Sequence, residues 1–319
     1  MTNNPDLLEL VVSTRVSETA DIMSVELSAA GGGPLPSFEA GAHIDVHVGN
    51  GLVRQYSLCN SPKERHRYRL GILRAPNSRG GSAGLHAVLE PGARVLVGKP
   101  RNAFRLSDDA AFVALIGGGI GITPLMSMAQ ALHDAGKPFE LHYCVRSRRD
   151  GAFIGELEAA PFGRAVHLHF DDGGAEQRFA PSALARRRDV HIYMCGPAGF
   201  MEWVQTGLKN AGLRPERFHL ERFSGDVDAC GDEFEVLAAR SGKRVTVNAT
   251  QSIAQALAAA GIPVELSCEQ GVCGTCVTRV LEGCPDHRDL YQTDAERATN
   301  ENIALCCSRS LTPLLSLDI

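Results

Sequence analysis

Three cysteines lie close together in the stretch SCEQGVCGTC. Cys268, Cys273 and Cys276 follow the spacing C-x4-C-x2-C. Thiolates at this spacing, together with a distant fourth cysteine, ligate a [2Fe-2S] cluster from a single loop. Cys306 lies 30 residues after Cys276 and Cys307 follows it directly, so the spacing allows either one as the fourth ligand. The pattern therefore predicts a one-electron carrier.

A zinc site is the main alternative for these thiols. Structural zinc sites usually pair two C-x2-C hooks, and the sequence contains only one. Gly271 and Gly274 suit a loop whose backbone N–H groups curl around inorganic sulfur. We therefore predict an iron–sulfur cluster and not zinc.

A second group of residues could hold a phosphorylated flavin. Arg54, in RQYSLCN, offers a bidentate fork for a phosphate. The following Tyr56-Ser57 stretch can place backbone and hydroxyl groups along the edge of an isoalloxazine ring. In the later segment RGGS, the glycines let main-chain N–H groups approach the same phosphate closely. Any one of these motifs alone would fit an ordinary strand or turn.

A glycine-rich turn, GGGIGITP at residues 117–124, follows the apolar segment AFVALI. We expect it to lead into a helix with Thr123 as the N-cap and Pro124 as the first helical residue. Such a helix N-terminus favours an anion like pyrophosphate. The turn is not the Rossmann fingerprint, because Pro124 stands where glycine is needed and no acid ends the second strand, HYCV.

The pattern of apolar and polar residues that surrounds these motifs changes twice along the chain. Short alternating segments separated by Gly, Pro and Asn predict an antiparallel β-barrel flavin domain over residues 1–106. Apolar strands alternating with helices predict a parallel-sheet α/β nucleotide domain over residues 107–224. A linker over 225–232 then leads to an α+β domain over 233–319, with a hairpin, a helix and the cysteine loop.

Size and composition agree with a multidomain globular protein. The chain has 319 residues, 44% hydrophobic and 22% charged, with a net charge of −5. This charge argues against nucleic acid as the main partner, and no apolar run is long enough for a membrane span. Without a secretory signal pattern we expect a cytoplasmic protein, where clustered cysteines favour metal or redox chemistry over disulfides.

The cysteine segment closely resembles plant-type ferredoxin domains, which have a β-grasp fold, and the resemblance extends to CCSRS. The family pattern of cysteine, a variable residue and Ser-Arg assigns Cys306 as the fourth ligand and Cys307 as the variable position. RQYSLCN, RGGS, GGIGITP and the later CGP resemble the ferredoxin-reductase superfamily. The order flavin barrel, nucleotide domain, ferredoxin resembles the phthalate dioxygenase reductase family, whose members use FMN.

This resemblance implies two sets of cofactor contacts. The implied FMN contacts are Arg54, Gln55, Tyr56, Ser57, Gly71, Ile72, Leu73, Arg79, Gly80, Gly81, Ser82, Thr123 and Phe223. The implied NAD contacts are Gly118, Gly119, Gly121, Thr123, Cys195, Gly196 and Pro197. Cys195 is expected near the nicotinamide ring, with simple core packing as the alternative.

By the same resemblance, electrons pass from NADH to FMN, to the [2Fe-2S] cluster, and to a terminal oxygenase of the Rieske non-haem iron type that acts on an aromatic ring. The hydride step needs no acid–base residue, so we name no catalytic residue. Two alternatives are a reductase of the same build for another acceptor, such as an O-demethylase or carnitine-type monooxygenase, and a non-enzymatic redox sensor.

Two sets of polar residues leave alternatives open. Arg146, Arg148 and Arg149 could bind the 2′-phosphate of NADPH, although the family resemblance favours NADH and a solvated basic surface is the simpler interpretation. His167 and His169 alternate along the segment VHLHF, and we interpret them as ordinary polar strand positions instead of metal ligands.

Overall fold

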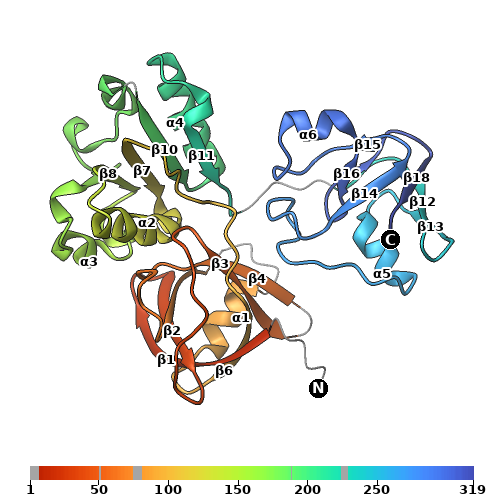
Figure 1. Ribbon diagram of the computed structural model, residues 1–319, viewed down its shortest axis with the longest axis horizontal. Helices are drawn as coiled ribbons and strands as arrows, with labels where there is room; N and C mark the ends of the chain where they lie inside the picture. Colours follow the sequence, from red (N-terminus) through yellow and green to blue (C-terminus); the bar gives the residue numbers. More distant parts are fainter. Residues whose placement is uncertain (1–6, 50–51, 75–80, 188, 224–228) are drawn as a thin grey trace. The chain divides into compact units, whose positions relative to one another are not determined.

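The computed structural model (Figure 1) describes residues 7–49, 52–74, 81–187, 189–223 and 229–319. The chain divides into two compact units, Met1–Phe223 and Ser224–Ile319. The first unit contains the barrel and the parallel sheet, and the second contains the cysteine loop. Residues 225–228 of the predicted linker lie outside the described residues. The domain boundaries proposed from the sequence stay predictions.

An antiparallel six-stranded sheet forms the first part of unit one. In spatial order β4-β3-β6-β1-β2-β5, its strands are β4 (Leu52–Ser57), β3 (His43–Gly49), β6 (Arg94–Gly98), β1 (Leu7–Ser17), β2 (Ile22–Ala29) and β5 (Tyr68–Leu73). A bridge from Leu58 to Leu70 joins the two edges, so the sheet is a nearly closed barrel. Helix α1 (Gly81–Val88) buries Leu85 in the barrel core.

A parallel five-stranded sheet follows in the same unit. In spatial order its strands are β11 (Phe218–Glu221), β10 (Val190–Cys195), β7 (Phe112–Gly118), β8 (Phe139–Val145) and β9 (Val166–Phe170). Alternate residues of β7 enter two different cores: Val113 and Leu115 pack with α2 (Ile122–Asp134), whereas Ala114 and Ile116 pack with α4 (Ala198–Asn210). Both faces are covered, as the apolar strands predict.

Short helical segments connect these strands. The α-helix α3 is Ile154–Ala159, and the 3₁₀ segments are η1 (Gly119–Gly121), η2 (Arg148–Asp150), η3 (Gly163–Ala165), η4 (Ala175–Gln177), η5 (Pro181–Arg186) and η6 (Pro215–Arg217). Among the described residues, no helix is both long and apolar enough to cross a membrane.

The start of α2 differs from the sequence prediction. The glycine turn winds into η1, and α2 begins directly after it at Ile122, with Gly121 as the N-cap. Thr123 is therefore inside the helix, and its hydroxyl donates to the Ile120 carbonyl at 3.0 Å. The predicted N-cap at Thr123 was wrong because the 3₁₀ turn starts the helical winding earlier. Pro124 still lies in the first turn, where its missing N–H is not needed.

Unit two is built on a mixed five-stranded sheet. In spatial order its strands are β13 (Lys243–Val247), β12 (Phe234–Ala238), β18 (Leu314–Leu317), β14 (Val277–Glu282) and β16 (Asn302–Ala304). The β12–β13 hairpin is antiparallel as predicted, and β18 adds in parallel to β12. The remaining elements are α5 (Ile253–Ala259), α6 (Asp294–Thr299), β15 (Pro285–Asp286) and β17 (Arg309–Ser310).

Arg309 stabilises the start of unit two from within its core. Its side chain is 2% exposed, and its guanidinium lies over the Phe234 ring, 5.1 Å from the centroid. It donates to the backbone carbonyls of Ala229, Gly231, Asp232, Asn248 and Gln251. One buried cation therefore satisfies carbonyls from the chain entering β12 and from the segment before α5.

We expect Arg309→Ala to lower the free energy of unfolding of unit two by about 3–5 kcal/mol, because several buried carbonyls lose their donor. The control is Arg240→Ala, which removes an arginine whose side chain is 71% exposed and paired with Asp318. It should change stability little. Denaturant unfolding followed by the cluster absorbance measures both, and equal effects would contradict this role for Arg309.

Candidate functional site

The cysteine loop lies between α5 and β14 and brings three thiols next to Cys306, which follows β16. The thiol of Cys306 contacts those of Cys268 and Cys276, and the thiol of Cys268 contacts that of Cys273. These contacts lower the pKa of Cys268 and Cys276 and raise the pKa of Cys273 and Cys306, because neighbouring sulfurs share protons. A set of four converging thiols suits a [2Fe-2S] core.

Cys307 is fully buried and has different neighbours. Its sulfur lies 3.8 Å from the Ala304 carbonyl and 3.8 Å from the Ser308 hydroxyl. It also contacts the thiol of Cys306. Cys306, in contrast, contacts two cysteines of the loop. It is therefore better placed than Cys307 to be the fourth cluster ligand.

Two glycines allow the cysteine loop its tight path. Gly271 has φ +70°, and a Cβ there would lie 2.8 Å from the Cys307 sulfur. Gly274 has φ +75°, and a Cβ would lie 2.4 Å from Cζ of Tyr291. The backbone N–H of Gln270 donates to the Cys268 sulfur at 3.4 Å. The loop therefore offers thiolates together with an N–H donor to sulfur, which is the donor set of an iron–sulfur site.

In unit one, the barrel and the parallel sheet meet at the ends of three strands. Ser57 ends β4, Cys195 ends β10 and Glu221 ends β11, where it is the register partner of Cys195. The Ser57 hydroxyl donates to Oε2 of Glu221 at 3.5 Å. A Cβ on Gly71 of β5 would lie 2.7 Å from Cγ2 of Thr123. Residues predicted to bind flavin and residues predicted to bind NAD are thus brought together.

The other predicted flavin residues have varied surroundings. Nη1 of Arg54 donates to the Val53 carbonyl at 2.7 Å, and Nε2 of Gln55 donates to Oδ1 of Asp45 at 3.1 Å. Burial raises the pKa of the Tyr56 phenol, and the charge of Arg54 opposes this shift. Arg54 and Tyr56 are two residues apart on the edge strand β4, so their side chains share one face, where a phosphate and a ring could be held together.

Two of the predicted flavin positions are committed to packing through their side chains. Ile72 is fully buried in the barrel core, and Leu73 packs against the core of the parallel sheet. Only their backbone is suited to face a cofactor. Phe223, after β11, is 38% exposed. Gly81 and Ser82 begin α1, whereas Arg79 and Gly80 lie outside the described residues.

Two of the predicted nucleotide residues, Gly118 and Gly196, lie close to the Phe200 ring. A Cβ on Gly118 would lie 2.7 Å from the Phe200 ring, and one on Gly196 would lie 2.9 Å from it. A Cβ on Gly121 would lie only 2.2 Å from the carbonyl oxygen of Cys195. Pro197 is the N-cap of α4. The glycines therefore let the η1 loop lie directly against the end of β10.

Three further features bear on the nucleotide. Gly119 has φ +54° and open space around its Cα, so backbone can be exposed there. Arg148, one of the three arginines considered for a 2′-phosphate, is ion-paired with Glu158. Cys195 is fully buried, and burial together with Glu221 raises the pKa of its thiol well above the usual value. The Cys195 thiol is therefore neutral at physiological pH and is not an activated nucleophile.

Glu221 is a candidate functional residue that our sequence interpretation missed. Burial raises the pKa of its carboxyl to about 8, and the hydrogen bond from Ser57 opposes this shift. The carboxyl is therefore mainly protonated at neutral pH. The sequence contains one signal for this residue. Glu221 is the single acidic residue at the end of the segment FHLE, two residues before Phe223.

The raised pKa gives Glu221→Gln a pH-dependent effect on stability. Between the ordinary value of 4.5 and about 8, folded Glu221 holds a proton that the unfolded chain has released. Wild-type stability therefore falls as pH rises through this window, by up to about 1.4 kcal/mol per pH unit. We expect the variant to gain stability relative to wild type from pH 5 to pH 8. Thermal unfolding midpoints would show this, and a constant difference would contradict the raised pKa.

Comparison with known families agrees with these sites. Residues 237–311 match the sequence model of a family described as the 2Fe-2S iron-sulfur cluster binding domain. Residues 115–206 match that of the oxidoreductase NAD-binding domain. The matched segments contain the cysteine loop and the η1 glycine turn.

Two curated relatives span almost the whole chain. The vanillate O-demethylase oxidoreductase of Pseudomonas sp. (strain HR199 / DSM 7063) is 44% identical over 317 residues, 98% of this chain and 100% of the relative. The phenoxybenzoate dioxygenase subunit beta of Ectopseudomonas oleovorans is 45% identical over 314 residues, 97% of each chain.

Solved structures show the same architecture. Phthalate dioxygenase reductase, described as a modular structure for electron transfer from pyridine nucleotides to [2Fe-2S], matches with a TM-score of 0.78 and 36% identity, covering 99% of this chain and 98% of that one. An intact type IV self-sufficient cytochrome P450 monooxygenase matches with a TM-score of 0.84 and 36% identity over 98% of this chain. This chain spans only 41% of that longer protein.

The fold class predicted from the sequence is therefore confirmed: an antiparallel barrel, a parallel nucleotide-binding sheet and a C-terminal ferredoxin domain. The thiols of unit two suit a cluster, and the glycine loop of unit one suits a dinucleotide. The chain belongs to the phthalate dioxygenase reductase family, NADH-dependent iron–sulfur flavoprotein oxidoreductases that use FMN, NADH and a [2Fe-2S] cluster.

Proposed function

We propose that this protein is the NADH-dependent reductase of a Rieske-type non-haem iron oxygenase that acts on an aromatic substrate. The names of its relatives, vanillate O-demethylase oxidoreductase and phenoxybenzoate dioxygenase subunit beta, support this class of partner. The observation that carries the proposal is the junction in unit one, where Glu221 is hydrogen-bonded to Ser57 and is the register partner of Cys195. The same chain carries four converging thiols in unit two.

We assign the cluster ligands as Cys268, Cys273, Cys276 and Cys306. The contacts among these four thiols support the assignment. The FMN and NAD contacts named from the family resemblance keep their proposed roles. The junction between β4, β5 and the start of α2 supports them, because it places predicted FMN residues beside predicted NAD residues.

The residues around Cys195 would bind and orient reactants and would not exchange protons with them. When bound, the cofactors supply hydride transfer and the conversion of an electron pair into single electrons. Ser57 and the protonated Glu221 form a neutral, hydrogen-bonded wall at the junction, and the neutral Cys195 thiol adds no charge. Such a wall favours close approach of two flat rings and excludes water.

Reconstitution tests the proposed partner. The purified reductase, NADH and purified Rieske oxygenases for vanillate, phenoxybenzoate and carnitine would be combined, and product formation measured. We expect turnover with an oxygenase for a methoxylated or phenoxylated aromatic acid. Turnover with the carnitine enzyme alone would favour the alternative acceptor. Rapid NADH oxidation without turnover by any oxygenase would contradict the proposed partner class.

Two narrower proposals accompany this function. We infer a preference for NADH over NADPH, which the ion pair between Arg148 and Glu158 supports, and kcat/KM for the two nucleotides measures it. We also infer a cytoplasmic location, because NADH is a cytoplasmic reductant and the described part of the chain contains no disulfide. A redox sensor remains the second interpretation, and slow NADH oxidation with a dye as acceptor would favour it.

A further inference from the structure

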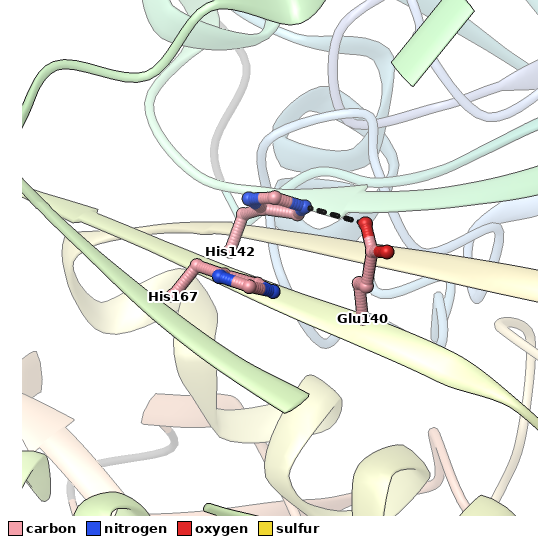
Figure 2. Close-up of side chains that lie close together, drawn as sticks. All are labelled: Glu140, His142 and His167. Atoms are coloured by element: carbon pink, nitrogen blue, oxygen red, sulfur yellow. Dashed lines mark ion pairs between the residues drawn. The ribbon is translucent and has the colours of Figure 1, made fainter. Parts of the chain in front are cut away.

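Glu140, His142 and His167 form a cluster on the parallel sheet of unit one (Figure 2). Glu140 and His142 lie two residues apart on β8, and His167 is the register partner of His142 on the neighbouring strand β9. One ligand atom from each side chain lies within 4.8 Å of the other two, and Nε2 of His142 is 3.4 Å from Oε2 of Glu140. The three side chains therefore share one face at the edge of the sheet.

His142 has a buried nitrogen without a hydrogen-bond partner. Its side chain is almost fully buried, and Nε2, the atom that faces Glu140, makes no hydrogen bond. The His142 ring stacks on that of His167, with centroids 4.9 Å apart and an interplanar angle of 19°. An orphaned polar atom in a buried position is costly unless a ligand satisfies it.

The contact of the other nitrogen of His142 decides whether Nε2 is free to ligate a metal. Nδ1 of His142 lies 3.0 Å from Nε2 of His169. If Nδ1 donates to His169, Nε2 of His142 keeps a free lone pair directed toward Glu140. In the opposite tautomer the proton on Nε2 would face Oε2 of Glu140 at 3.4 Å without forming a hydrogen bond, so metal binding requires the first tautomer. A metal-ligating histidine typically donates its other ring N–H to an acceptor, and Nε2 of His169 can fill that role here.

The surrounding side chains hold this arrangement in place. Phe179 packs against the rings of His142 and His169, with centroids 5.1 Å away in both cases. An imidazole binds a metal through an unprotonated ring nitrogen, and Nε2 of His142 is the nitrogen of this ring that no protein group hydrogen-bonds.

We propose that Glu140 Oε2, His142 Nε2 and a ring nitrogen of His167 bind a divalent transition metal of the zinc class. Two imidazoles and one carboxylate suit zinc better than magnesium or calcium, which prefer oxygen. With bonds of about 2.0–2.2 Å, the ligand atoms must lie about 3.4 Å apart. The half-buried Glu140 and the exposed His167 can close this gap by side-chain rotation, and water takes the fourth position.

One cation lies near the proposed site. Nη2 of Arg187 is 3.9 Å from Oε1 of Glu140, and its guanidinium stacks over Phe112. Arg187 thus approaches the carboxylate oxygen that does not face His142. This weak ion pair engages Oε1 and leaves Oε2 available to a metal.

The site lies away from the proposed nucleotide site. Glu140 and His167 are the second residues of β8 and β9, at the amino ends of these strands. The η1 glycine loop follows the carboxyl end of β7. Because the strands are parallel, it lies at the end of the sheet opposite to these amino ends. A metal there would join the edge strand β9 to β8 and stabilise unit one, without contributing to electron transfer.

Zinc titration of the intact holoprotein tests this site. Untagged protein with FMN and the cluster in place would be titrated with ZnCl₂ by calorimetry, and zinc and iron counted by plasma mass spectrometry after dialysis. The test variants are Glu140→Gln and His167→Gln, both at accessible positions. The control is His191→Gln, from the stacked His191–His219 pair, whose Nδ1 and Nε2 atoms lie 3.1 Å apart on the same sheet.

We expect one zinc ion per chain in the wild type and in His191→Gln, with unchanged iron content and a raised unfolding temperature. Glu140→Gln and His167→Gln should each bind zinc at least about tenfold more weakly. NADH oxidation with a dye as acceptor should be the same in all four proteins. No stoichiometric zinc in the wild type, or equal affinity in the test variants and wild type, would overturn the proposal and leave the proposed function untouched.

Discussion

Cys306→Ser is expected to lose or severely distort the [2Fe-2S] cluster and to stop electron delivery to an oxygenase. The thiol of Cys306 contacts those of Cys268 and Cys276, so its removal takes one of four sulfurs from the core. NADH oxidation with a dye that accepts electrons from the flavin should persist within about twofold, because this reaction uses unit one alone. Iron content, the visible spectrum and oxygenase-coupled product formation measure the change.

Cys307→Ser is the matched control, one residue further along the chain. Cys307 is also fully buried, and its sulfur lies 3.8 Å from both Ala304 and Ser308. A serine there keeps polar contacts of similar geometry, so the cluster and product formation should remain. The reverse result, with the cluster kept in Cys306→Ser and lost in Cys307→Ser, would move the fourth ligand by one residue.

Gly121→Ala is expected to have the largest effect in unit one. The added Cβ would lie 2.2 Å from the Cys195 carbonyl oxygen and 2.7 Å from the Gly196 nitrogen, both backbone atoms that cannot rotate away. The η1 loop must therefore shift from the end of β10, at a cost of about 1–3 kcal/mol in stability. Displacing the proposed nucleotide loop should lower kcat/KM for NADH by up to about a hundredfold.

Gly155→Ala is the control for this substitution. Gly155 lies in α3, and a Cβ there meets nothing within 4 Å. Alanine favours a helix over glycine, so this variant should be as stable as wild type or slightly more stable. In both variants the cluster spectrum should be unchanged. Wild-type kcat/KM in Gly121→Ala would contradict the close packing of the glycine loop on β10.

The features best predicted from the sequence are those fixed by local spacing. The cysteine spacing C-x4-C-x2-C places its ligands within one loop, so no long-range contact is needed to recognise it. The β12–β13 hairpin and the alternation of strands with helices are also local patterns, and the family comparisons confirm the fold class.

Other features depend on which strands become neighbours. Glu221 owes its raised pKa to burial at a junction of the barrel and the parallel sheet, where it meets Ser57 from 164 residues away in the chain. His167 was interpreted as an ordinary polar position because its register with His142 could not be known before the sheet was assembled. At Thr123 the error was local, since glycine-rich sequence gives no signal for where a 3₁₀ turn ends and an α-helix begins.

Anaerobic addition of NADH to the oxidised holoprotein tests the central claim most directly. The claim is that one chain accepts electrons from NADH in unit one and delivers them to the four-thiol cluster of unit two. In samples frozen as soon as wild-type reduction is complete, electron paramagnetic resonance should show the reduced cluster in wild type, and neither Gly121→Ala nor Cys306→Ser should reach wild-type intensity. A cluster that stays oxidised in the wild type while NADH is consumed would contradict the account.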